Sequence, residues 1–243
     1  MIATYKIANK NIQISSIYKS IHEYCRDYRT VETHDFTVEI SPSDIDFERE
    51  KSAREDIFEG HKIIKYPDDY LEELAVYRKI AEKMPEFDTL LLHGSAVAVD
   101  GFCYLFTAPS GTGKSTHTKL WCELLKDRAV MVNDDKPLIT ITTNSAVAHG
   151  TPFNGKHRLG NNISVPIKAI CILGRSEVNC IHEITPTKAY TTLLQQTYRP
   201  SNPISMKKTL ELIDKLKTLV KFYSLSCNME LEAAEISYNA MKG

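Results

Sequence analysis

The sequence lacks paired cysteines: its six cysteines are scattered singly, and none has the Cys-x-x-Cys spacing of a zinc or redox motif. Several lie inside apolar runs such as KAICILG, where a buried free thiol is the usual interpretation. A reducing, cytoplasmic environment would keep such thiols free. We therefore expect reduced thiols at all six positions: Cys25, Cys103, Cys122, Cys171, Cys180 and Cys227.

Long apolar runs and an excess of one charge are also missing. No run of about 18 apolar residues is present, so we expect no membrane span. Residues 1–10 alternate apolar and polar side chains instead of forming the apolar segment of a signal peptide. The formal net charge of -1 argues against a long basic groove, and we expect no nucleic acid partner. The sequence does not decide the oligomeric state, so a homo-oligomer remains one of the alternatives.

What is present suits a globular protein with a sizeable core, since 42% of the 243 residues are hydrophobic and 25% are charged. Residues 1–87 are typical of a small α+β segment, with strand alternation at 12–17 and 35–41 and helical spacing at 17–28 and 67–84. The polar stretch 41–60 favours an exposed helix or loop. No Gly/Ser linker follows, so we expect this segment to pack onto the rest of the chain.

Residues 88–243 alternate strand-like and helix-like patterns. Asp100-Gly101 separates two apolar runs and is a strong hairpin signal. Thr185 followed by Pro186 predicts the start of a helix, and Asn228 is expected to cap another. The fold class predicted is α/β, a mixed sheet with helices packed on it. Its strands are expected at 89–93, 96–108, 129–135, 137–142, 167–174 and 221–227, and its helices at 114–126, 185–198, 203–220 and 228–241.

The stretch APSGTGKST, which follows the second hairpin strand, fits the phosphate-loop pattern G-x-x-x-x-G-K-[ST], with Ala108 in place of the first glycine. Gly111 and Gly113 allow a tight turn that aims backbone N–H groups at phosphate oxygens. A helix beginning near Lys114 adds its positive dipole end. We expect Lys114, as a solvent-facing cation, to reach the β- and γ-phosphates, and the Ser115 hydroxyl to bind Mg²⁺.

The strand-like run AVMVNDD ends in two acids. Carboxylates at such a strand end, beside a phosphate loop, commonly bind Mg²⁺ or its waters. Asp134 follows Lys114 by only 20 residues, so the helix after the loop leads directly to the acidic strand. His93 ends the run TLLLH, and taken alone such a histidine is more often structural than functional.

In this order, LLHGSAV, FTAPSGTGKST and VNDDKPLI resemble the kinase domain of HPr kinase/phosphorylase. More distantly, they resemble the nucleotide site of phosphoenolpyruvate carboxykinase. The resemblance covers about residues 88–175 and implies a P-loop kinase core with ATP and Mg²⁺ as cofactors. It places Ser110, Gly111, Thr112, Gly113, Lys114, Ser115 and Thr116 around the triphosphate.

The same resemblance places His93, Asp134 and Asp135 around the metal and the transferred phosphoryl group. It favours Asp135 as the base, with Lys114 and His93 as the other catalytic residues and with Asp134 and Ser115 on Mg²⁺. In carboxykinases the matching histidine and one aspartate bind metal, so His93 and Asp135 are candidate ligands too. Whether Asp135 is base or ligand stays open.

The segment 146–162 departs from the HPr kinase pattern because it has no acid where that family has a Glu-x-Arg-Gly-type metal ligand. This argues against phosphorylase activity and against HPr as the substrate. The polar loop 150–162, with Gly150, Gly155, Lys156, His157 and Arg158, could close over the nucleotide or supply a cation, or it could be a solvated surface loop. Both interpretations stay open.

The function predicted is that of an ATP-dependent kinase, a phosphotransferase that moves the γ-phosphoryl group to a hydroxyl of a protein, peptide or small molecule. The alternatives are a non-enzymatic nucleotide-binding regulatory or accessory protein and a plain NTPase. The acidic pair and His93 favour the enzyme, because a binding protein needs no base.

Overall fold

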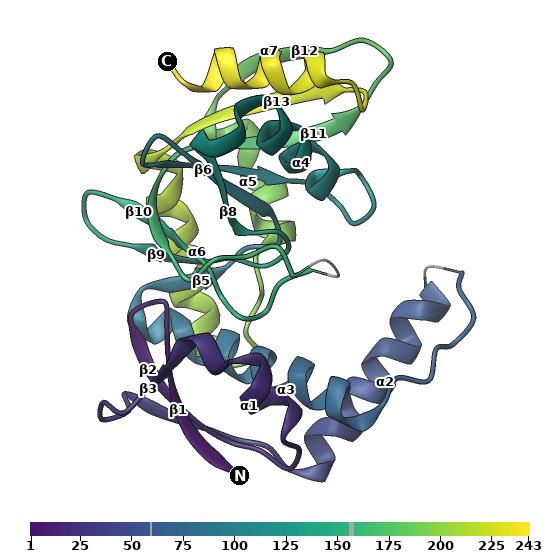
Figure 1. Ribbon diagram of the computed structural model, residues 1–243, viewed down its shortest axis with the longest axis vertical. Coiled ribbons are helices and arrows are strands. Elements are labelled where there is room, and N and C mark those ends of the chain that lie inside the picture. Colours follow the sequence, from purple (N-terminus) through teal and green to yellow (C-terminus); the bar gives the residue numbers. More distant parts are fainter. Residues whose placement is uncertain (59, 156–157) are drawn as a thin grey trace. The chain divides into compact units, whose positions relative to one another are not determined.

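The computed structural model describes residues 1–58, 60–155 and 158–243 (Figure 1). Its contacts divide the chain into two compact units, Met1–Ala81 and Glu82–Gly243. The domain boundary that the sequence places between residues 87 and 88 stays a prediction. The described helices include none that is both long and apolar enough to cross a bilayer.

The first unit is built on a four-stranded sheet in the order β3-β1-β2-β4. Alternating burial, with Ile7, Ile12 and Ile14 fully buried, gives this sheet one core-facing side. The β1–β2 hairpin turns through Ala8 and Asn9, both at positive φ. The strands are β1 (Ile2–Ile7), β2 (Lys10–Ser15), β3 (Arg29–Thr30) and β4 (Phe36–Glu39).

Three α-helices and a 3-10 turn complete this unit: α1 (Ser20–Tyr24), η1 (Arg26–Tyr28), α2 (Pro42–Phe58) and α3 (Asp68–Lys83), whose last two residues fall in the second unit. The stretch expected to be an exposed helix or loop is the helix α2. Its buried positions include Glu48, whose carboxylate accepts a hydrogen bond from Arg78 Nε at 2.5 Å. A buried ion pair therefore helps to hold α2 against α3, because few apolar side chains of α2 are buried.

The second unit contains a nine-stranded mixed sheet in the order β5-β9-β10-β11-β7-β6-β8, with β13 beside β11 and β12 beside β13. The strand β11 begins antiparallel to β10 and continues parallel to both β7 and β13. The strands are β5 (Thr89–Leu91), β6 (Ser95–Val99), β7 (Phe102–Thr107), β8 (Ala129–Asn133), β9 (Leu138–Ile141), β10 (Ala146–His149), β11 (Ser164–Arg175), β12 (Cys180–Ile184) and β13 (Lys221–Cys227).

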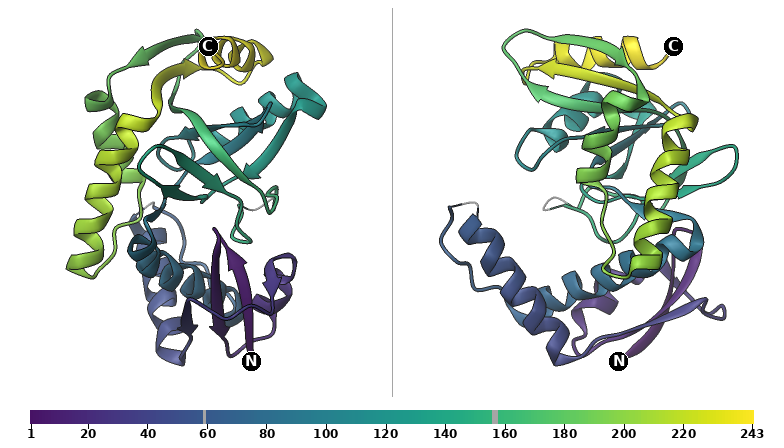
Figure 2. Two further views of the ribbon diagram at one scale, coloured as in Figure 1. Left: turned by 90° about the vertical axis from the view of Figure 1, so that its left-hand side faces the viewer. Right: turned by 180° about the vertical axis from the view of Figure 1, so that it is seen from behind.

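Helices cover both faces of this sheet (Figure 2). Successive side chains of β7 point to opposite faces, so Leu105 joins the core under α5 and α6 while Phe106 joins the core under α4 and α7. Both cores are made of buried, largely apolar side chains. The helices and 3-10 turns are η2 (Met84–Phe87), α4 (Lys114–Leu125), η3 (Lys126–Arg128), α5 (Pro186–Gln196), α6 (Pro203–Leu219) and α7 (Leu231–Met241).

The mixed α/β class and the main strands and helices are as the sequence predicts. Asp100 and Gly101 turn the β6–β7 hairpin at positive φ, and the Thr185 side chain caps α5 by accepting from Lys188 N. The prediction for Asn228 is wrong: its Oδ1 accepts from Glu230 N, and α7 begins only at Leu231. The short strands β10 and β12 were not predicted.

Candidate functional site

The loop between β7 and α4 is the first part of the candidate site. Gly111 and Gly113 have φ values of 74° and 118°, which favour glycine, although a Cβ at either position would meet no atom within 4 Å. Gly113 is the N-cap of α4, and no side chain caps the first turn. Its backbone N–H groups therefore remain available to an anion.

A guanidinium from another strand fixes this loop. Arg175, at the end of β11, donates to the backbone oxygens of Gly111 and of Thr112, the latter at 3.3 Å. Sequence reasoning missed Arg175, because nothing near it in the chain points to residues 111 and 112. Ser110 and Thr116 are exposed on the same loop and first turn.

Lys114 is not the solvent-facing cation that the sequence analysis expects. It is 7% exposed, and its Nζ donates to the backbone oxygens of Ala108 at 2.8 Å and Pro109 at 3.3 Å. Burial lowers the pKa of Lys114 below its ordinary value, and the nearby Asp135 carboxylate offsets part of that effect. The ammonium group thus lies folded against its own loop.

The end of β8 lies directly against the first turn of α4. Ser115 Oγ donates to the backbone oxygen of Asp134 at 3.2 Å. Asn133 is fully buried, and its Oδ1 accepts from the N–H groups of Asp135 at 2.9 Å and Lys136 at 2.8 Å. This turn fixes the backbone after the strand, so Asn133 is a structural residue of the site that the sequence analysis left without a role.

The two acids face different partners. Asp134 is 3% exposed, and its Oδ1 accepts from Gly155 N at 2.6 Å. Asp135 is half-buried, with Oδ1 at 3.4 Å from His93 Nε2 and Oδ2 at 3.6 Å from Lys136 Nζ. Asp134 is thereby held by the segment 150–162, whereas Asp135 forms a pair with the histidine.

Asp135 is an ionised carboxylate at neutral pH. Burial by itself would raise the pKa of Asp135, but the hydrogen bond with His93 and the positive charges of Lys136 and Lys114 outweigh it. The net pKa of this carboxyl lies below its ordinary value.

His93 is held by contacts from two other elements. Its Nδ1 lies 2.9 Å from Gln196 Oε1, at the end of α5, and its backbone N–H donates to the backbone oxygen of Gln196 at 2.8 Å. Thr107 Oγ1, at the end of β7, donates to the backbone oxygen of His93 at 2.8 Å. The imidazole ring therefore lies between the Gln196 side chain, which faces Nδ1, and the Asp135 carboxylate, which faces Nε2.

The expected metal ligands are brought together only in part. His93 pairs with Asp135, and Ser115 lies beside Asp134, yet among the described residues no three histidine, cysteine or acidic side chains converge on one point. The assignment of these residues as ligands stays a prediction.

The segment 150–162 is anchored in its described parts. A Cβ on Gly150 would lie 1.7 Å from the backbone oxygen of Asn161, and Asn161 Nδ2 donates to Met131 O at 2.8 Å. Thr151 and Phe153 are buried. A freely solvated loop is therefore the wrong interpretation of its first part, residues 150–155, whereas Arg158, Leu159, Asn161 and Asn162 are exposed. Lys156 and His157 lie outside the described residues.

Comparisons with known proteins give one family. A search of curated proteins finds no match. Among solved structures, the chain is similar to the Hpr(Ser) kinase/phosphatase from Coxiella burnetii, with 10% sequence identity, a TM-score of 0.35, and coverage of 63% of this chain and 99% of that chain. The family model described as SynChlorMet cassette protein ScmC matches residues 70–230, and the chain belongs to this family.

Proposed function

We propose that this protein is an ATP-dependent kinase that uses Mg²⁺ and transfers the γ-phosphoryl group to a hydroxyl group. The acceptor is a serine of a protein or peptide, or a small molecule. The observation that carries the proposal is the hydrogen bond from Ser115 Oγ to Asp134 O, because it joins the first turn of α4 to the acidic end of β8. An anion site and a carboxylate base are the two parts that phosphoryl transfer needs.

The triphosphate fits the β7–α4 loop. The first turn of α4 has no side-chain cap, and Gly111 and Gly113 hold the backbone at positive φ. On binding, Lys114 would exchange the two loop carbonyls that it now contacts for a phosphate oxygen. A buried ammonium group stabilises negative charge more strongly than one in water.

The oxygen donors near the loop suit Mg²⁺. This ion prefers oxygen ligands and is commonly held by one or two carboxylates together with substrate phosphates and water, so a cluster of protein ligands is not required. Ser115 Oγ and the carboxylate of Asp134 would hold it, which leaves Asp135 to act as the base. When bound, Mg²⁺ neutralises charge on the β- and γ-phosphates.

Asp135 is the group best placed to accept the proton of the acceptor hydroxyl. In the transfer, the acceptor oxygen forms a bond to the γ-phosphorus, the bond to the β–γ bridging oxygen breaks, and ADP leaves with that electron pair. The hydroxyl proton passes to the ionised Asp135 carboxylate. His93, at 3.4 Å from Oδ1, orients this carboxylate.

Asp135→Asn tests the base. A positioned base contributes about 10²–10⁴-fold in rate, so turnover should fall by that order while the affinity for Mg-ATP changes little. Isothermal calorimetry measures binding, and transfer of the labelled γ-phosphoryl group to product or water measures turnover. Asp127→Asn, an exposed acid-to-amide change on η3, is the matched control. Wild-type turnover in Asp135→Asn would remove the base assignment.

Two further variants separate the roles. Lys114→Ala should lose tight Mg-ATP binding while keeping the circular dichroism of the wild type. His93→Ala should lower turnover independently of Mg²⁺ concentration if it orients Asp135, and should be partly rescued by added Mg²⁺ if it is a ligand. Nucleotide binding by the wild type without any product would favour a non-enzymatic accessory protein instead.

A further inference from the structure

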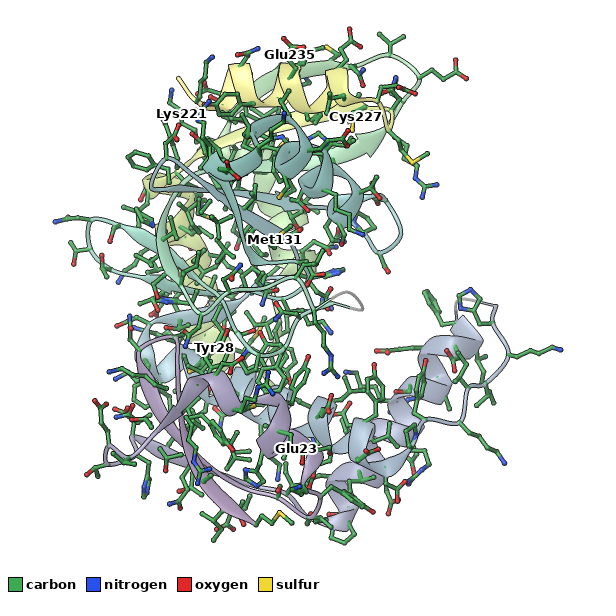
Figure 3. All side chains as sticks on the ribbon, in the orientation of Figure 1. Glu23, Tyr28, Met131, Lys221, Cys227 and Glu235 are labelled. Carbon is green, nitrogen blue, oxygen red and sulfur yellow. The ribbon has the colours of Figure 1, made fainter. Side chains whose placement is uncertain are left out.

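A cavity of about 560 Å³ adjoins the β7–α4 loop at one edge of the second unit's sheet. The strands β7, β11 and β13 run parallel there, since Ile172 pairs with Thr107 and Arg175 with Cys227. Their carboxyl ends therefore reach the same end of the sheet. Figure 1 labels β11 and β13 there, and Figure 3 labels Cys227, the last residue of β13. The lining includes Gly111, Thr116, Leu120, Leu173, Cys227 and Met229.

Position alone makes this edge a place for a ligand. In open α/β sheets, ligands bind outside the carboxyl ends of the parallel strands, where loops from separate strands converge. Here the cavity is lined by the loop after β7, the end of β11, the turn after β13 and the helix α4. A volume of this size lies within the ordinary range for small-molecule sites.

The walls are mainly apolar. Leu173 is 5% exposed, and Leu120 packs against the same core. Cys227 is partly buried, and burial raises the pKa of its thiol, so it is uncharged at neutral pH. Met229 is 76% exposed, which leaves a flexible thioether free to cover a flat ring.

The charged members of the lining, Arg175 and Glu177, are exposed. Arg175 donates hydrogen bonds to the backbone oxygens of Gly111 and Thr112, so it fixes the part of the lining that the cavity shares with the loop. An anion-binding loop and an apolar cavity thus have residues 111–113 in common. A ligand that spans both would be anionic at one end and weakly polar at the other.

We propose that this cavity holds the base and ribose of the nucleotide, with Leu120, Leu173 and Met229 in contact with the base. The proposal rests on the proposed function, because it takes the phosphates to lie on the β7–α4 loop. It adds that two parts of the site contribute separately to the affinity for the nucleotide. One part, the phosphate half of the site, binds the phosphates, and the other, the nucleoside half, binds the base and ribose.

Binding of Mg-ATP and of inorganic tripolyphosphate, each measured by calorimetry, tests the two halves separately. Leu120→Trp fills the cavity from α4 and should weaken ATP binding about tenfold or more, which corresponds to about 1.4 kcal/mol. Tripolyphosphate affinity should stay within about twofold of wild type, because the loop is untouched. The matched control is Leu124→Trp, one turn along α4, which packs on the same core but does not line the cavity.

Met229→Ala provides a second variant whose exposed position leaves the core intact. It should weaken ATP binding about threefold and leave tripolyphosphate binding unchanged. Unchanged ATP affinity in both variants, with tripolyphosphate still bound, would overturn the nucleoside cavity and leave the proposed function standing. A wild type that binds neither ATP nor tripolyphosphate would instead overturn the proposed function.

Discussion

The stability of the second unit should fall as the pH drops from about 6.5 to about 4, because burial lowers the pKa of two of its histidines, His117 and His149, and the contribution of His149 can be isolated by substitution. His149, at the end of β10, is 1% exposed. Its two ring nitrogens contact hydroxyls on the neighbouring strands, Ser164 Oγ at 2.7 Å and Thr140 Oγ1 at 2.9 Å. A neutral imidazole has one donor and one acceptor, which these hydroxyls can satisfy together.

The magnitude follows from the pKa of His149. Burial lowers it from 6.5 to about 4 in the folded state. Between these values the unfolded chain binds a proton that the folded chain does not, so stability rises with pH in this window and is fully present above it. One pKa unit is worth about 1.4 kcal/mol, which gives a loss of about 3 kcal/mol by pH 4.

Urea unfolding followed at several pH values from 7.5 to 4.5 measures this loss. In His149→Gln the amide keeps a donor and an acceptor but cannot gain a proton, so its free energy of unfolding should depend less steeply on pH. The difference between the two slopes should approach about 1.4 kcal/mol per pH unit. His182→Gln, an exposed change on β12, should follow the wild type. Parallel curves for wild type and His149→Gln would refute the reasoning.

Three further predictions concern the site and the thiols. Arg175→Ala should weaken ATP binding, because the loop loses the guanidinium that holds the backbone oxygens of Gly111 and Thr112. Arg175→Lys should bind ATP as weakly, because one ammonium group cannot span two carbonyls as a guanidinium does. Calorimetry measures the affinity of both variants. Gln196→Leu should lower kcat and shift its pH profile by freeing the His93 ring, and Gln196→Glu should restore part of the rate. Thiol titration should find one readily reactive group, exposed Cys180, in the native protein and six after unfolding.

The parts of the fold that depend on local chemistry could be predicted from the sequence. The Asp100-Gly101 turn, the Thr185 cap and the glycines of the β7–α4 loop each act within a few residues of themselves. Their effects follow from backbone sterics and from hydrogen bonds to neighbours, so the residue types indicate them directly. Asn133 belongs to the same class, because an asparagine after an apolar run is typical of a turn.

The parts that depend on distant partners could not be predicted. Asp134 is held by Gly155, which lies 21 residues further along the chain. The contact between His93 and Gln196 joins residues on separate elements. Nothing near any of these residues in the chain specifies its partner.

The order of the strands in the sheet decides whether the nucleoside half of the proposed site can form. The apolar runs of β7, β11 and β13 are all typical of buried strands, and such runs do not specify which of them become neighbours. Only the observed pairing brings the loop, Leu173 and Cys227 to one edge and creates the cavity between them. The phosphate half of the proposed site is therefore encoded locally, in residues 108–116, whereas the nucleoside half arises from topology. It follows that substitutions in the loop should change the affinity for any polyphosphate, while substitutions at Leu120 and Met229 should change the affinity only for ligands that carry a base.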